Sequence, residues 1–391
     1  MPGETRPGVV APPPASGAWR DGDPVGDRNF TDVGDLELEA GGSLPGVRLA
    51  YETWGELSPH GDNAVLVEHA LTGDSHVTGP PGPGHPTPGW WQGLIGPGRG
   101  IDTDRWFVVA PNVVGGCQGS TGPASTAPDG RPWGSRFPFL TLRDQVEAEA
   151  RLADALGIGA WALVMGGSMG GMRALEWGVT HPGRVRRLFV LGASTTATAD
   201  QIGWCAPQLA AIRSDPGFAG GDYYDAADGE GPHAGLGVAR RIAHATYRSA
   251  TELDLRFGRS AQPGERPIGG GGRYAVESYL DHHADKLVHR FDANTYVVLT
   301  EAMSSHDVAR GRGSVEAALA RVSARTVVAS IDSDRLYPVR LGEEIAAGIR
   351  GCRGLDLITS PYGHDSFLIE TGAVADLVSG LLADRSVRAV G

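Results

Sequence analysis

Residues 166–170 read Gly-Gly-Ser-Met-Gly, and the segments on either side leave few folds open to the chain. The apolar run at 162–165 predicts a strand before this pentapeptide, and the pattern at 171–177 predicts a helix after it. A sharp turn from strand to helix requires small flanking residues and holds Ser168 in a strained conformation. The serine hydroxyl then stands at the carboxyl edge of a sheet, near a helix N-terminus that favours negative charge. We therefore predict that Ser168 is a nucleophile; the alternative is an incidental serine in a glycine-rich turn.

Predicted strands and helices alternate up to about residue 193 and again after about residue 306. Thr141 is expected to cap one helix with Asp144 as its capping-box partner, and Gly157 and Gly159 are expected to end that helix. This alternation predicts an α/β protein with a mostly parallel central sheet flanked by helices. Further strands are predicted at residues 47–52, 64–68, 106–110, 188–191, 326–331 and 355–359.

The chain divides into three regions by pattern. Residues 1–30 are rich in proline, glycine and charge, and we expect a flexible or loosely docked arm there. Residues 194–306 contain no convincing strand, and their clearest helical stretches are 240–249 and 294–304. The simplest interpretation is one catalytic domain, residues 31–193 and 307–391, interrupted by a helical lid at 194–306.

A serine hydroxyl is a poor nucleophile until a base accepts its proton. The chain order Ser, then Asp or Glu, then His is that of the α/β-hydrolase fold, which we therefore predict. Asp334 follows the predicted strand 326–331 and is our candidate for orienting the base, with Asp332 left open as an alternative. His364 follows the last predicted strand, in a predicted loop, and is our candidate base. Three other histidines are expected to be solvated or structural: His282, His283 and His306.

Acyl transfer through a serine also requires backbone N–H donors for the tetrahedral intermediate. Met169, the residue after the nucleophile, is expected to provide one. Leu71 is expected to provide the other, because it lies in the loop after the predicted strand 64–68. Gly73 would let that loop approach the site closely.

Composition excludes several classes of function. The formal net charge of −12 and the lack of a basic stripe argue against binding to nucleic acid or to an anionic membrane. No apolar run of spanning length and no secretory signal is visible, and three cysteines at unrelated spacings show no metal or disulfide pattern. We expect a cytoplasmic protein without a metal ion. Cys117 is expected to be a small packed residue near the site, with a reactive thiol as the alternative.

Several longer segments, in this order, resemble the homoserine O-acetyltransferase family of methionine biosynthesis: HALTGDSHV, GGCQGSTGP, GGSMGGM, SDRLYP and GHDSFL. The resemblance covers roughly residues 30 to 385 and implies a triad at Ser168, Asp334 and His364. It further implies ping-pong transfer of an acetyl group from acetyl-CoA, a co-substrate and not a bound cofactor, to the hydroxyl of L-homoserine. Such enzymes are homodimers that pack through the helical insertion.

The same resemblance suggests how homoserine is held. Arg240 would pair with the substrate carboxylate, with Arg241 as the near alternative, because a planar guanidinium meets a carboxylate at two points. Tyr247, two helical turns further on, would hydrogen-bond the substrate, and Asp365 would pair with its ammonium group. Each could instead have a packing role.

Two other functions remain open from sequence. The acyl donor could be succinyl-CoA, or the acceptor could be serine or a larger alcohol, because the same triad serves all of them. Water could also be the acceptor, which would make the protein an esterase.

Overall fold

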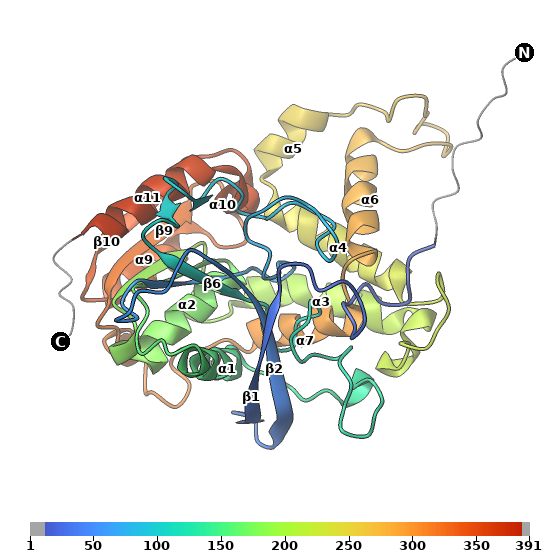
Figure 1. The fold of residues 1–391 in the computed structure, drawn as a ribbon. Coiled ribbons are helices and arrows are strands. Elements are labelled where there is room, and N and C mark those ends of the chain that lie inside the picture. The colour runs from blue at the N-terminus through green and yellow to red at the C-terminus, as the bar shows by residue number, and fades with distance from the viewer. Residues whose placement is uncertain (1–11, 385–391) are drawn as a thin grey trace, which may run out of the picture.

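The structure, a computed structural model, describes residues 12–384 and is built around an eight-stranded sheet of order β1-β2-β6-β3-β7-β8-β9-β10 (Figure 1). The strands from β6 to β10 in that order run parallel, and β2 and β1 add an antiparallel edge. This sheet confirms the predicted α/β class. Its strands are β1 (Asn29–Glu37), β2 (Ser43–Trp54), β3 (Ala64–Glu68), β6 (Phe107–Pro111), β7 (Leu163–Gly167), β8 (Arg187–Leu191), β9 (Arg325–Ile331) and β10 (Cys352–Ile358). The short strands β4 (Ile95–Gly96) and β5 (Ile101–Asp102) pair separately.

Both faces of the sheet are buried, which explains why its central strands are mostly apolar. In β3, Leu66 packs into one core, whereas Val65 and Val67 pack into the other. In β7, Val164 faces the first core and Leu163 the second. Helices α1 (Leu142–Ala155), α2 (Met169–Thr180) and α9 (Val339–Gly348) cover the first face, and α11 (Thr371–Ala383) covers the second (Figure 1). The sheet is therefore the middle of three layers.

The start of α1 follows the predicted capping box. The Thr141 hydroxyl oxygen accepts the backbone N–H of Asp144 at 3.2 Å, and the Asp144 carboxylate accepts the backbone N–H of Thr141 at 2.8 Å. The remaining short elements are η1 (Gly134–Arg136), η2 (Pro182–Arg184), α8 (Val315–Leu319), η4 (Gly363–Asp365) and α10 (Ser366–Ile369).

The chain between β8 and β9 is helical, and α4, α5 and α6 stand beside the sheet's carboxyl edge (Figure 1). The elements are α3 (Ala199–Ser214), η3 (Pro216–Gly221), α4 (His233–Tyr247), α5 (Ala250–Phe257), α6 (Ala275–Val288) and α7 (Ala293–Ser304). Helix α4 begins seven residues before the predicted stretch 240–249, because its first turns contain glycines that lower helix propensity. Gly235 is required there by close packing, since a Cβ would collide with the carbonyl of Ala211 in α3. The helix ends at Tyr247, where Arg248 turns to an extended conformation.

The expectation of a flexible or loosely docked arm at residues 1–30 is wrong for the described part from residue 12 onward, and residues 1–11 lie outside the described residues. Ser16 donates a hydrogen bond to the buried carboxylate of Asp292 at 2.7 Å, and the N–H of Trp19 donates to the carbonyl of Cys117 at 2.9 Å. Arg28 is buried and donates to the carbonyl of Gln118 at 3.1 Å. These contacts satisfy buried polar groups, so this segment is part of the folded body.

Two further differences concern short elements. Strand β1 was not predicted, because its residues are polar and its pairing with β2 is interrupted by irregularities around Gly34. Residues 363–365 form a turn of 3-10 helix instead of a loop.

Among residues 12–384, no single helix is long and apolar enough to cross a membrane. One pair of helices bent by 66°, Gly363–Ile369 and Thr371–Ala383, meets the length and composition requirements only when the two are taken together.

Candidate active site

Ser168 occupies a sharp turn between β7 and α2. Its backbone angles are φ 58° and ψ −126°, a conformation that non-glycine residues rarely adopt. The glycines around it are required sterically. A Cβ at Gly166 would collide with the carbonyl of Gly170, and one at Gly170 would collide with the carbonyl of Glu68. The predicted elbow is therefore present, and it presents Ser168, only 7% exposed, at the carboxyl end of β7.

The structure brings Asp334 and His364 together from separate loops. Nδ1 of His364 lies 2.6 Å from Oδ2 of Asp334, and both side chains are buried. Oδ1 of Asp334 accepts the backbone N–H groups of Leu336 and Tyr337, each at 2.8 Å, which fixes the carboxylate. Asp332, the alternative, is exposed and accepts the N–H of Ser360 instead. The geometry therefore favours Asp334 as the partner of the imidazole.

The other ring nitrogen of His364 is free to act as a base. Because Nδ1–H donates to Asp334, the neutral ring carries its lone pair on Nε2. This Nε2 is buried and has no hydrogen-bond partner among the described residues, so the expected contact with the Ser168 hydroxyl is not formed here. Catalytic hydrogen bonds often form only when substrate is bound.

Tyr337 contacts all three members of the predicted triad, and sequence reasoning missed it. Its N–H donates to Asp334, its ring stacks on His364 with centroids 4.8 Å apart, and its phenol lies beside the Ser168 side chain. Phe367 packs edge-on against the imidazole, with centroids 5.4 Å apart. The sequence shows Tyr337 within the SDRLYP segment, but its contact with His364 depends on how two segments distant in sequence meet.

The predicted oxyanion donors have unused N–H groups. Within residues 12–384, neither the amide of Leu71 nor that of Met169 has a hydrogen-bond partner, and both residues are buried. A buried, unpaired amide is costly unless a ligand oxygen completes it. Gly73 accepts no side chain because a Cβ would lie 2.8 Å from that of His69. Its φ is not in the left-handed region, so close approach and not backbone freedom explains this glycine.

Arg240 and Arg241 have different surroundings. Arg241 donates to Asp281 at 2.8 Å, so its charge is already paired. Arg240 makes one long hydrogen bond, 3.4 Å to the Thr72 hydroxyl, and its buried Nε has no partner among the described residues. Its guanidinium lies 5.7 Å from the centre of the Tyr247 ring. Arg240 therefore remains available to an anionic ligand beside the loop that contains Leu71.

Tyr247 and Asp365 line the same region. The Tyr247 ring lies 5.9 Å from that of His364, and burial raises the pKa of its phenol to about 12, so it stays neutral. Asp365 lies 3.6 Å from Arg248. Burial raises the pKa of the Asp365 carboxyl, although Arg240, His364 and Arg248 oppose this rise. The region thus combines a free cation, a phenol and a carboxylate within reach of the base.

The remaining candidates are packed groups. Burial raises the pKa of the Cys117 thiol to about 12, so it is not a ready nucleophile. His306 is buried against the carbonyl of Ser194 at 3.1 Å, and burial lowers its pKa. His283 stacks on His244 with centroids 3.8 Å apart.

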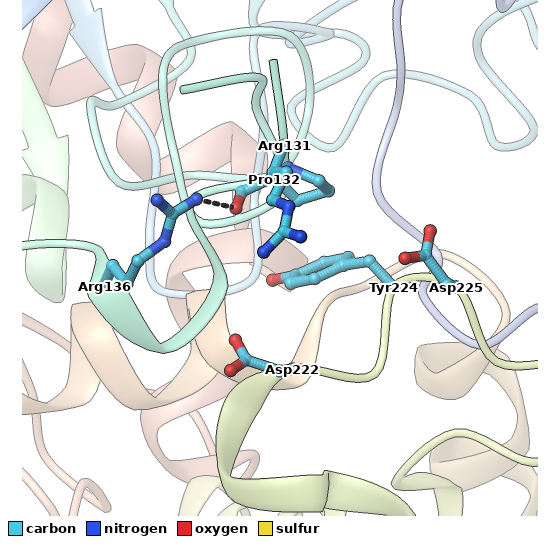
Figure 2. A pocket seen from close by; sticks show the side chains of 6 residues that line it. All are labelled: Arg131, Pro132, Arg136, Asp222, Tyr224 and Asp225. Atoms are coloured by element: carbon cyan, nitrogen blue, oxygen red, sulfur yellow. Dashed lines mark hydrogen bonds between the residues drawn. The ribbon is translucent and has the colours of Figure 1, made fainter. Parts of the chain in front are cut away.

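The large surface cavities lie elsewhere. One of about 390 Å³, between the loop after β6 and η3, is lined by Arg131, Pro132, Arg136, Asp222, Tyr224 and Asp225 (Figure 2). Arg136 turns back there to the carbonyl of Pro132 at 2.8 Å. No predicted site residue lines this cavity, so we do not assign the reaction to it.

Comparison with known proteins agrees with the fold described above. A family model described as the alpha/beta hydrolase fold matches residues 63–371. The chain is 64% identical over 376 residues to the homoserine O-acetyltransferase of Thermobifida fusca, covering 96% of this chain and 99% of that one. It is 62% identical to the homoserine O-acetyltransferase of Clavibacter michiganensis, over 96% of this chain and 97% of that one.

Solved structures include both transferases and hydrolases. Homoserine O-acetyltransferase from Bacillus anthracis superposes with a TM-score of 0.82 at 27% identity, covering 93% of this chain and 98% of that one. An acetylester hydrolase from Corynebacterium glutamicum superposes with a TM-score of 0.77 at 28% identity, covering 92% and 96%.

Proposed function

The chain belongs to the homoserine O-acetyltransferase family within the α/β hydrolases, and we propose that it transfers acetyl from acetyl-CoA to L-homoserine through an acetyl ester of Ser168. This reaction belongs to methionine biosynthesis. The observation that supports this most directly is the buried, unpaired Nε2 of His364, which Asp334 holds in the basic tautomer. Tyr337, which stacks on this imidazole, also lies beside the strained Ser168.

In the first half-reaction, the Ser168 hydroxyl attacks the thioester carbonyl and its proton passes to Nε2 of His364. The carbonyl electrons move to oxygen, where the amides of Leu71 and Met169 donate hydrogen bonds. Collapse breaks the carbon–sulfur bond, and the His364 proton passes to the departing CoA thiolate. Acetyl-CoA is thus a co-substrate, and this scheme requires no resident cofactor.

In the second half-reaction, the homoserine hydroxyl attacks the ester and His364 accepts its proton. The same two amides stabilise the second tetrahedral intermediate. When it collapses, the proton returns to the Ser168 oxygen and O-acetylhomoserine leaves. Arg240 would bind the substrate carboxylate, Asp365 its ammonium, and the neutral Tyr247 phenol would hydrogen-bond to it.

Hydrolysis of the acetyl ester is the second candidate, because the Corynebacterium glutamicum acetylester hydrolase has a similar fold. The free guanidinium of Arg240 favours transfer, since a water acceptor has no carboxylate to bind. Intact mass spectrometry after mixing with acetyl-CoA, followed by peptide mapping, tests the ester on Ser168. Release of CoA and acetate at a rate independent of homoserine would instead support the hydrolase.

We further propose a cytoplasmic homodimer that packs through the helical insertion. Large apolar side chains on α3, α4 and α5 support this contact: Trp204 is 42% exposed, Val238 42% and Leu255 81%. All three cysteines are free thiols, in keeping with a reducing compartment. Light scattering on the wild type and on Trp204→Glu tests the dimer, which the added charge should weaken.

A further inference from the structure

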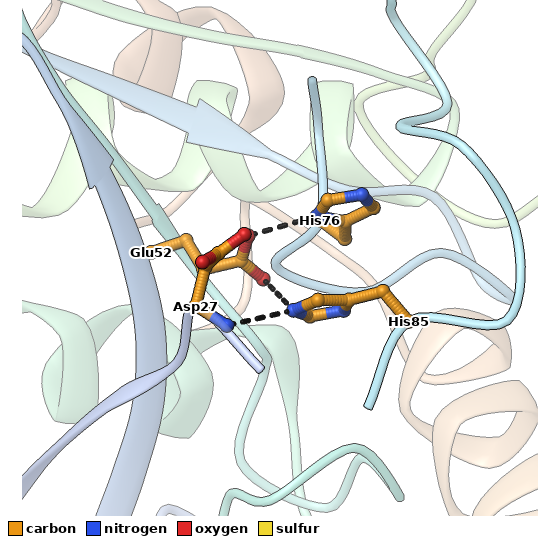
Figure 3. Close-up of side chains that lie close together, drawn as sticks. All are labelled: Asp27, Glu52, His76 and His85. Carbon is orange, nitrogen blue, oxygen red and sulfur yellow. Dashed lines mark hydrogen bonds and ion pairs between the residues drawn. The ribbon is translucent and has the colours of Figure 1, made fainter. Parts of the chain in front are cut away.

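A carboxylate outside the predicted triad contacts the segment that follows the loop containing Leu71. Glu52 belongs to β2 and is 1% exposed. Its Oε1 accepts the Ser75 hydroxyl at 2.7 Å. Its Oε2 lies 2.9 Å from Nδ1 of His76 (Figure 3). The ring of His85 also lies close, with Nε2 3.6 Å from Oε1, but this nitrogen accepts a backbone N–H and does not donate to the carboxylate. A buried carboxylate is tolerated only with hydrogen-bonding partners, and here those partners are Ser75 and His76.

The hydrogen bonds define the charge of this group. Both ring nitrogens of His76 face acceptors, Glu52 on one side and the carbonyl of Pro80 at 3.3 Å on the other. Only an imidazolium can donate to both. Burial opposes that charge, but the hydrogen bond and charge of Glu52 outweigh it and raise the pKa of His76, with a smaller contribution from Asp74.

His85 has the opposite role. Its ring stacks on that of His76, with centroids 4.0 Å apart, and its Nε2 accepts the N–H of Asp27 at 3.2 Å. Burial lowers the pKa of His85, and Arg28 and His76 also lower it, whereas Glu52 and Asp74 oppose them. A neutral His85 therefore covers a charged His76.

The cluster of two carboxylates and two histidines has the composition of a metal site, but the lone pairs that would bind a metal are already engaged. The ligand atoms of Asp27, Glu52, His76 and His85 lie within 4.8 Å of one another (Figure 3). A metal would need the Nδ1 lone pair of His76 and the Nε2 lone pair of His85. Here Nδ1 faces Glu52 as a donor, and Nε2 accepts a backbone N–H. The group closes on itself as a hydrogen-bonded clamp.

This clamp holds one end of the loop that contains Leu71. Ser75 and His76 lie four and five residues after Leu71. On the other side of Leu71, Arg173 of α2 donates to the carbonyl of His69 at 2.9 Å. The Leu71 amide thus lies between one anchor on the helix that follows the nucleophile and another on β2. An oxyanion donor must be held within tenths of an ångström of its acceptor to stabilise the transition state.

We propose that Glu52 is a positioning residue for the oxyanion hole, acting through Ser75 and His76 on the amide of Leu71. This inference rests on the proposed function, in which the Leu71 amide binds the tetrahedral intermediate. Glu52 touches no reacting atom. Losing its charge should loosen the loop, so that transition-state binding suffers while ground-state binding of the substrates does not.

The test compares Glu52→Gln with Glu176→Gln in the full chain. Glu176 is a matched control because it is another buried carboxylate, paired with Arg312 at 2.5 Å and placed eight residues beyond Ser168 on α2. With p-nitrophenyl acetate as acyl donor, Glu52→Gln should slow acylation and transfer to homoserine by a similar factor, about tenfold, with KM unchanged. This loss is smaller than the loss in kcat of about 10²- to 10³-fold that follows removal of one oxyanion donor. Glu52→Gln should also weaken inhibition by a boronic acid by a similar factor, because the boronic acid forms a tetrahedral adduct with the serine. Glu176→Gln should lose thermal stability only.

Wild-type rates and wild-type boronic acid affinity in a folded Glu52→Gln would overturn the inference, as would a change confined to KM. If Glu52→Gln does not fold, Ser75→Ala and His76→Gln remove the loop side of the clamp and should reproduce the effect in part. A chelator should leave both rates unchanged; a loss restored by zinc would mean that the clamp is a metal site. Wild type that reacts with the ester but not with acetyl-CoA would refute the proposed function and leave this inference standing.

Discussion

Replacing Arg240 by Ala should separate the two half-reactions. The guanidinium makes one 3.4 Å hydrogen bond, to Thr72, and its buried Nε has no partner among residues 12–384, so most of its donors are free for a carboxylate. Truncating one partner of a buried charge pair costs about 2–5 kcal/mol. At 1.36 kcal/mol per factor of ten, kcat/KM for homoserine should fall by roughly 30- to 5,000-fold. In the proposed scheme acylation by acetyl-CoA precedes homoserine binding, so its rate should be nearly unchanged.

Stopped-flow release of CoA measures the first half-reaction as a burst, and steady-state formation of O-acetylhomoserine measures the whole. Arg241→Ala is the matched control, because that neighbouring arginine is already paired with Asp281. It should leave both rates near those of the wild type. The assignment would be refuted if Arg240→Ala abolished the burst, or if Arg241→Ala caused the larger loss in homoserine use.

Three further outcomes are expected. Ser168→Ala should fold normally and show no acetylated peptide by mass spectrometry, with kcat reduced by about 10³- to 10⁶-fold; a modified protein would refute the nucleophile. Tyr337→Phe keeps the ring on His364, whereas Tyr337→Leu removes the stacking that supports the imidazolium, so the phenylalanine variant should lose less kcat. Equal losses of activity in the two variants, compared through their pH profiles of kcat/KM, would contradict a role for the ring. Asp365→Asn should impair homoserine use yet stabilise the fold at neutral pH. Burial raises the folded-state pKa of Asp365, so the wild type loses stability as pH rises from the ordinary aspartate pKa of the unfolded chain to this raised value. Calorimetry should show the gain of the variant developing over that interval and staying constant above it.

The local patterns predicted most of the central strands and the elbow. The apolar runs at 64–68 and 188–191 correspond closely to β3 and β8, because a strand buried on both faces is recognisable from its residues alone. The capping box at Thr141 was predictable for the same reason, since its contacts join residues three apart. By contrast, the polar strand β1 gave no local signal, because its position depends on pairing with β2.

For the site, the sequence determined the chemical groups and the structure decided among neighbours. Ser168 is set by a steric requirement that is expressed in the consecutive residues 166–170. Whether Asp334 or Asp332 orients the imidazole, and whether Arg240 or Arg241 is free, depends on which way each side chain points once loops distant in sequence have met.

The contacts of Tyr337 and the clamp around Glu52 show the same limit. The stacking of Tyr337 on His364 and the pairing of Glu52 with His76 each join residues more than twenty positions apart, and no periodicity links such residues along the chain. The residues by themselves determined a strained serine, an acid and a base in the order of one fold. Only tertiary packing decided which buried groups hold the loops in place, because burial and partnership are properties of the assembled layers.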